Sequence, residues 1–218
     1  MLIRFALVAE GTSDHGLVRH LEDLCVRLGA SEATGEIPPF DLLSKPPGKT
    51  IPGRLSVLHE LCPDVGLVFV HRDADSVGSA VRRAEIEAGI PQNFPVVVPV
   101  IPIAELEAWL LLDERALFAA VGRPLKSGLL DMPKSAHIES LSHPKELLKT
   151  LLAQASGKTG KRLARVSKDF AANRRFLIER LEIDGPVRQL AAWLCLMEEL
   201  RSALAHLGNQ RKDVHLQR

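Results

Sequence analysis

The stretch VGLVFVHRDAD, Val65–Asp75, decides the fold, because an apolar run in it is followed at once by charged residues. An apolar run of this length is typical of a strand buried on both faces of a parallel sheet. A second run, LIRFALVA at Leu2–Ala9, ends in Glu10 in the same way. Ligands of a parallel sheet bind outside the carboxyl ends of its strands. We therefore expect Glu10, Asp73 and Asp75 to lie together at one edge of the sheet.

The rest of the first half alternates between helical and strand patterns. Helical spacing covers residues 17–28, 51–61 and 77–88, a further strand covers 95–101, and a short edge strand is predicted at Phe40–Leu43. Two prolines in 95–101 place that strand at an edge or at the end of the sheet. Strands that alternate with helices favour βαβ units. We expect an α/β domain over residues 1–102, with a parallel sheet flanked by helices.

The sequence pattern changes after Pro102, where helical patterns replace the alternation of strands and helices. Helical patterns cover 104–121, 144–154, 161–182 and 186–207, and a polar tail that we expect to be frayed begins at Gly208. Residues 103–218 are therefore predicted to form a mostly helical region that packs on the α/β domain.

Composition excludes several classes of protein. The formal net charge of +1 gives no global attraction to nucleic acid or membrane, so any such attraction must be local. No stretch matches a signal peptide or the roughly 20 apolar residues of a membrane span. The three cysteines lie far apart and form no zinc spacing, which favours a reducing compartment. We expect a soluble, cytoplasmic protein without a membrane partner.

The acidic residues at the strand ends indicate a metal site. Clustered carboxylates repel one another and seldom stay together without a cation. Asp73 and Asp75 are two residues apart, so they face the same side if the extended geometry of the strand persists. Mg²⁺ takes oxygen ligands and keeps several waters, so two or three carboxylates suffice. The alternative is structural: the two aspartates cap the next helix, and Glu10 hydrogen-bonds the turn that follows it.

Two segments resemble a known domain. Ala6–Asp14 (ALVAEGTSD) is similar to the glutamate motif of the Toprim (topoisomerase–primase) domain, and Val68–Ser76 (VFVHRDADS) is similar to its DxD motif. The resemblance implies Mg²⁺, or Mn²⁺, used for making or breaking phosphodiester bonds. It gives Glu10, Asp73 and Asp75 the metal-binding and catalytic roles, with Glu10 also a general acid or base.

A second resemblance extends further along the chain. Pro102–Asp113 (PIAELEAWLLLD) and His143–Leu148 (HPKELL) are similar to stand-alone prokaryotic Toprim-like proteins, which are suspected of roles in defence or mobile-element biology. Glu105 either joins the metal site, since it follows the fourth strand, or it has only a structural role. In that role it lies in the first turn of a helix, where an acidic side chain interacts favourably with the helix dipole. Lys145 either contacts a substrate phosphate or is simply solvated.

A basic stretch follows. Residues 158–180 hold eight basic side chains and two acidic ones. Five of the basic residues recur at three- and four-residue spacing: Lys158, Lys161, Arg162, Arg165 and Lys168. One cationic helix face suits contacts with nucleic-acid phosphates, although such a face is also common on ordinary solvated helices.

These features support a metal-dependent phosphodiesterase on nucleic acid, most simply a nuclease. A topoisomerase is disfavoured because the chain has no tyrosine, and 4% aromatic residues do not provide the series of stacking platforms of a dedicated single-strand binder. The alternative is a catalytically silent regulatory or interaction subunit. In that case the apolar segment Val187–Leu207 serves a protein partner or a homodimer, unless it belongs to the core. A phospho-acceptor receiver domain ranks below both, because Glu10 lacks the second acid that such a domain carries there.

Overall fold

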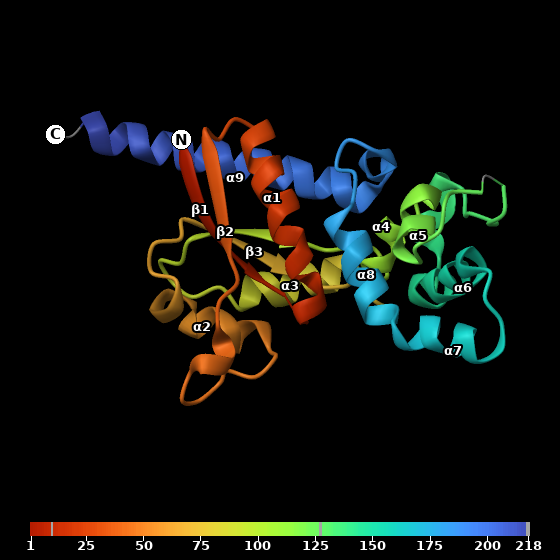
Figure 1. Cartoon of the computed structure of the whole chain (residues 1–218). Coiled ribbons are helices and arrows are strands. Elements are labelled where there is room, and N and C mark those ends of the chain that lie inside the picture. The colour runs from red at the N-terminus through yellow and green to blue at the C-terminus, as the bar shows by residue number, and fades with distance from the viewer. Residues whose placement is uncertain (10, 127, 217–218) are drawn as a thin grey trace.

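A four-stranded, all-parallel sheet forms the centre of the molecule. The computed structural model describes residues 1–9, 11–126 and 128–216, and their side chains up to Gln210 (Figure 1). The strands are β1 (Leu2–Val8), β2 (Glu32–Glu36), β3 (Leu67–His71) and β4 (Val96–Val100), in the order β2-β1-β3-β4. Helices flank the sheet, so the predicted α/β class with a helical C-terminal extension is confirmed.

One strand lies elsewhere than expected. The segment Phe40–Leu42 is a single 3₁₀ turn, and the edge strand beside β1 is β2. The sequence of β2, EATGE, has no apolar run because much of this edge strand faces solvent. Gly35 allows its close approach, since a Cβ there would lie 2.3 Å from the Phe5 ring. The edge position predicted for β4 is confirmed.

Helices cover both faces of the sheet (Figure 1). Helices α1 (Leu17–Arg27) and α9 (Ala191–Leu216) lie on one face, where Phe5 and Phe69 meet edge to face with ring centroids 5.0 Å apart. Helices α2 (Ile51–Leu61) and α3 (Ser79–Ala88) cover the other face. Buried apolar residues of β1 and β3 therefore contact helices on both sides, which explains their unbroken apolar runs.

The second half is helical but more divided than the periodicity predicted. Its helices are α4 (Glu107–Leu110), α5 (Glu114–Ala120), α6 (Pro144–Ser156), α7 (Gly160–Lys168) and α8 (Phe170–Glu179), with 3₁₀ turns at Ser135–Ser140 and Pro186–Gln189. Asp113 separates α4 from α5 because its carboxylate caps α5, accepting from the backbone N–H of Arg115 at 2.8 Å. At the other end, α9 continues through Gly208 to Leu216, where a frayed tail was expected.

The C-terminal helix closes the core. Trp193, Leu196 and Leu200 are buried in the cluster that also holds Phe5 and Phe69 of the sheet. Trp193 meets Trp109 of α4 edge to face, with ring centroids 5.1 Å apart. Most apolar residues of this segment thus serve the core, as one of the two interpretations held, whereas Leu194 is exposed. Within the described part of the chain, no helix combines the length and hydropathy needed to cross a bilayer.

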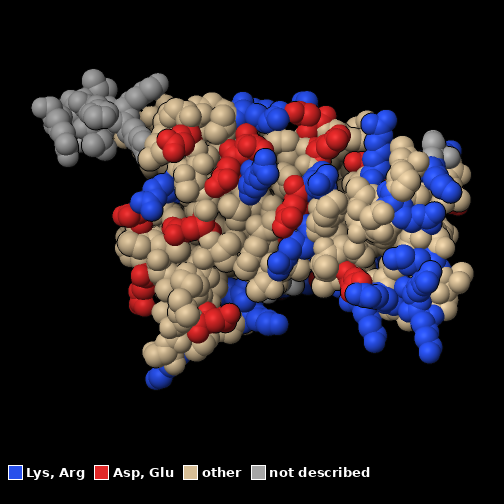
Figure 2. Space-filling model, in the orientation of Figure 1, with Lys and Arg blue, Asp and Glu red and all other residues tan. Residues whose placement is uncertain are grey.

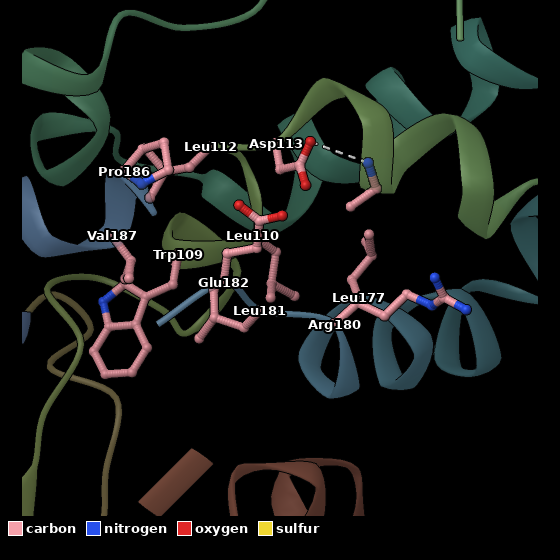
Figure 3. Close-up of a pocket in the computed structure, with 11 residues that line it drawn as sticks. Trp109, Leu110, Leu112, Asp113, Leu177, Arg180, Leu181, Glu182, Pro186 and Val187 are labelled. Carbon is pink, nitrogen blue, oxygen red and sulfur yellow. Dashed lines mark hydrogen bonds between the residues drawn. The ribbon is translucent and has the colours of Figure 1, made fainter. Parts of the chain in front are cut away.

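A small apolar cavity lies where α4, α5 and α8 meet (Figure 3). Its volume is about 20 Å³, and its walls include Leu110, Leu177 and Val187. A space of this size holds little more than one water molecule. The cavity is a packing gap between helices, and the site must be sought elsewhere.

Candidate functional site at the carboxyl ends of β1 and β3

The strand order defines where a ligand site is expected. The chain leaves β1 for β2 on one side and returns to place β3 on the other side of β1. Such a reversal opens a crevice at the carboxyl ends of the two strands, and open α/β sheets bind their ligands there. A hollow of about 430 Å³ lies at this point. We call it the acidic hollow; its lining residues are Gly11, Ser13, Asp14, Lys49, Asp73, Glu105, Glu107, Lys145, Phe170, Ala171 and Arg174.

Asp73 lines the acidic hollow and is held from one side. Its Oδ1 accepts a hydrogen bond of 2.8 Å from the backbone N–H of Leu106, at the start of α4. Its own carbonyl accepts from Nε of Arg82 at 3.0 Å. No described residue hydrogen-bonds its Oδ2. One carboxylate oxygen is thus fixed by the fold while the other is available to a ligand.

Asp75 does not join Asp73 in the hollow. The strand ends at His71, and Asp75 takes a left-handed backbone with φ of 47°. Its N–H donates to the carbonyl of Ala104, another left-handed residue with φ of 62°, at 2.8 Å. Its exposed carboxylate pairs with Arg82 at 2.9 Å. The extended geometry that would align the two aspartates does not persist, because this turn intervenes.

Glu105 and Lys145 meet through the backbone. Oε2 of Glu105 accepts from the N–H of Lys145 at 3.0 Å, in the first turn of α6. Glu105 therefore supplies negative charge to the start of α6, a different helix from the one that follows it in sequence. The side chain of Lys145 is exposed at the rim of the acidic hollow, where Lys49 also lies. The remaining predicted acid, Glu10, lies outside the described residues.

A buried ionic network forms the floor of the hollow. Arg174 of α8 donates from Nη1 to Asp14 at 2.7 Å and from Nε to Glu107 at 2.9 Å. On its other side, Asp14 lies 3.4 Å from Nδ1 of His71, and Asp73 lies 3.5 Å from Nε2 of the same ring. Arg174, Asp14, Glu107 and His71 are all buried. The network joins α8 of the second half to both central strands.

The network sets the charge of its members. Burial opposes the charge of His71, but Asp14 and Asp73 outweigh it and raise the pKa of His71 to about 10. Burial likewise opposes the charge of Asp14, yet His71 and Arg174 hold the pKa of Asp14 well below its ordinary 3.8. Neither ring nitrogen of His71 makes a hydrogen bond of normal geometry with a described residue, and its two acidic partners act on the ring from 3.4 and 3.5 Å. At neutral pH, His71 is a buried imidazolium between two carboxylates.

Sequence reasoning did not select the network. Asp14 and Arg174 are separated by 160 positions, and no local pattern pairs them. One signal was present: the positions three and four residues before and after Arg174 are all apolar, so it shares a helix face with apolar residues, which are Phe170, Ala171, Leu177 and Ile178. A basic residue on the apolar face of a helix predicts a buried acidic partner.

The donors for a metal ion are limited. No group of three or more His, Cys, Asp or Glu side chains is placed to hold a metal among the described residues, from which Glu10 is missing. Asp73 and Glu105 line the same hollow, and each has one carboxylate oxygen that no described residue hydrogen-bonds. Two such oxygens fit a hard cation that keeps most of its waters.

Basic residues cover the surface beside the hollow. Lys161, Arg162, Arg165 and Lys168 lie on α7, and Lys158 lies before it; all five are exposed, and we call them the basic face. In Figure 2, Lys and Arg side chains project from the corner of the molecule where Figure 1 shows α7. After Asp169, Phe170 and Ala171 form a wall of the acidic hollow. The end of the basic face at Lys168 therefore lies close to the hollow.

Comparisons with family models, with curated proteins and with solved structures give no match to this chain, so the resemblance to Toprim domains stays a prediction and function is inferred from the site.

Proposed function

We propose that the chain is a divalent-metal-dependent phosphodiesterase that acts on nucleic acid, most simply a nuclease. The observation that carries the proposal is the acidic hollow itself. It lies at the reversal of strand order, it contains carboxylates with available oxygens, and an exposed basic face adjoins it. Carboxylates and cations side by side suit a substrate that is itself anionic and requires a bound cation.

Each group has a role in this proposal. Asp73 and Glu105 hold Mg²⁺ or Mn²⁺, which polarises a phosphoryl oxygen and lowers the pKa of a bound water. Lys49 and Lys145 at the rim bind phosphate oxygens next to the reacting bond. The basic face binds the backbone on one side of that bond. Within the network, His71 places a positive charge 3.5 Å from Asp73, on the side of its carboxylate away from the ligand.

Calorimetric titration of Mg²⁺ and Mn²⁺ tests the proposal, first alone and then with a short oligonucleotide present. The informative pair is Asp73→Asn and Asp75→Asn, because each removes one charge from the same motif. We expect Asp73→Asn to abolish binding and cleavage of labelled DNA or RNA, and Asp75→Asn to retain both. Loss in both variants alike, or in neither, contradicts the assignment to the acidic hollow.

A second candidate is a regulatory or interaction subunit without catalysis. One observation favours it: the described acids do not form a three-ligand metal group, and Arg174 pairs with two of them. On this alternative, the wild type binds no metal even with oligonucleotide present, and Asp73→Asn changes only stability. The two candidates therefore separate in the same titration.

A further inference from the structure

A second hollow adjoins the acidic hollow. It has a volume of about 290 Å³, and its walls include Leu7, Ile37, Pro38 and Phe40. We call it the proline-lined hollow. Gly11 lines both hollows, so they meet directly at the carboxyl end of β1. One ligand can therefore extend from the acidic hollow into the proline-lined hollow.

The 3₁₀ turn Thr12–Gly16 stands between the two hollows. Residues three apart eclipse one another in such a turn. Thr12 and His15 accordingly line the proline-lined hollow, whereas Ser13 and Asp14 line the acidic one. The two faces of one turn thus present hydrogen-bonding groups to one hollow and a carboxylate to the other.

Two planar groups lie in the proline-lined hollow. The guanidinium of Arg54 stands over the ring of Phe40, 5.2 Å from its centroid. Arg54 is held in place through the backbone, donating to the carbonyls of Ala9 and Gly48. Aromatic rings and Arg guanidinium planes are the surfaces on which proteins stack unpaired bases.

Hydrogen-bonding groups of this hollow are available to a ligand. In the part of the chain that the structure describes, the side chains of Thr12, His15 and Asp41 make no hydrogen bond. Burial and the cations Arg175 and Arg54 outweigh the attraction of Asp14 and lower the pKa of His15, which favours its neutral ring with one donor and one acceptor. Polar groups of this kind, placed around apolar walls, are what reads the edge of a base.

We propose that the proline-lined hollow holds one unpaired base of the nucleic acid whose backbone lies in the acidic hollow. This inference rests on the proposed function and names its substrate class, a single strand or an unpaired end. A base within a duplex is stacked and cannot enter such a pocket without being extruded. The volume is at the lower limit of ligand pockets, which begin at roughly 300 Å³, and so suits one base. One platform also agrees with a chain of 4% aromatic residues.

Fluorescence anisotropy on labelled single strands tests the inference, with Ca²⁺ replacing Mg²⁺ to suppress cleavage. Two strands of equal length are compared, one with bases and one abasic. We expect the wild type to bind the base-bearing strand at least about fivefold more tightly, as one stacked base implies. Phe40→Leu should remove this preference without weakening the abasic strand, and Phe40→Trp should keep it. Thr12→Val, at the exposed rim, gives a second variant that does not disturb packing.

The outcomes separate the inference from the proposed function. Equal binding of the two strands by the wild type overturns the inference and leaves the proposed function standing. An unchanged preference in folded Phe40→Leu overturns it in the same way. If the wild type binds neither strand, the inference falls together with the nucleic-acid part of the proposed function.

Discussion

The floor of the acidic hollow and the basic face beside it contain the same kind of residue in opposite situations. Arg174 is buried and pairs with Asp14 and Glu107. Arg165, nine positions earlier, is exposed and has only Asp169 at 3.9 Å. A buried cation cannot leave its partners without a large penalty, whereas an exposed one exchanges water for a ligand at little cost. Burial therefore separates the charges that build this site from those that stay exposed to solvent.

The largest expected effect comes from breaking the buried side. Arg174→Met removes the guanidinium that pairs with the buried Asp14 and Glu107 and leaves His71 as the remaining cation beside Asp14, so we expect it to lower the free energy of unfolding by about 3–5 kcal/mol. Arg175→Met is the matched control, because Arg175 is the exposed neighbour and should change stability by less than about 0.5 kcal/mol. Urea unfolding measures both. Equal effects of the two variants would contradict the network as a structural unit.

The pH dependence of the free energy of unfolding tests the buried network in a second way. The folded protein keeps the proton of His71 up to about pH 10, while the unfolded chain loses it near 6.5. The contribution of His71 is therefore complete below 6.5 and is lost as the pH rises toward 10. We expect the free energy of unfolding to fall by about 1.4 kcal/mol for each pH unit above 6.5.

Urea unfolding between about pH 7 and 8 is dominated by this effect, because the thiols of the unfolded chain, with an ordinary pKa near 9, are still mostly protonated there. The buried thiols Cys25 and Cys62, whose pKa values burial raises to about 12 and 11, add a loss of the same sign at higher pH. His71→Gln should flatten the dependence in this window. A slope that persists in His71→Gln would assign it to other groups.

The basic face should affect the salt dependence of nucleic-acid binding and not the free energy of unfolding. Replacing Lys161, Arg165 and Lys168 by alanine should leave unfolding almost unchanged but weaken nucleic-acid binding. Each lost phosphate contact reduces the slope of log K against log salt by about 0.7 for a single strand, so the triple variant should lose about 2. Anisotropy titrations at several salt concentrations provide the slope.

The control for this variant removes three positive charges from other parts of the surface. Arg19, Arg188 and Arg201 are exposed and lie outside the basic face, on other elements of the chain. Their replacement by alanine should leave the salt slope unchanged. A similar fall in both triple variants would indicate only a response to net charge.

The smallest effect is expected at a residue that is neither as buried as the network nor as exposed as the basic face. Glu105 is partly buried and accepts from the N–H of Lys145 in the first turn of α6. Glu105→Gln keeps an acceptor but removes the charge at the helix start, so we expect a loss of about 0.5–1 kcal/mol in urea unfolding. A much larger loss would mean that the carboxylate supports more than this helix.

The sequence predicted what depends on local pattern and missed what depends on contacts between distant segments. The apolar runs of β1 and β3 mark strands because both faces are buried, and α2 matches its periodic apolar residues. β2 carries no such run because its faces are not both buried. Likewise, Asp73 was selected by its place after a strand, but the turn of Asp75 depends on a hydrogen bond to Ala104. The Arg174 network joins residues that no spacing relates.

The contact between Trp109 and Trp193 has a spectroscopic consequence. The chain has two tryptophans and no tyrosine, so its intrinsic fluorescence arises at one buried junction between α4 and α9. Both rings belong to residues 103–218, whereas far-UV circular dichroism reports helices throughout the chain. Coincident unfolding midpoints by the two signals would show that the helical region and the sheet unfold as one cooperative unit. An earlier fluorescence midpoint would show that α9 leaves its partner while the rest of the chain is still folded.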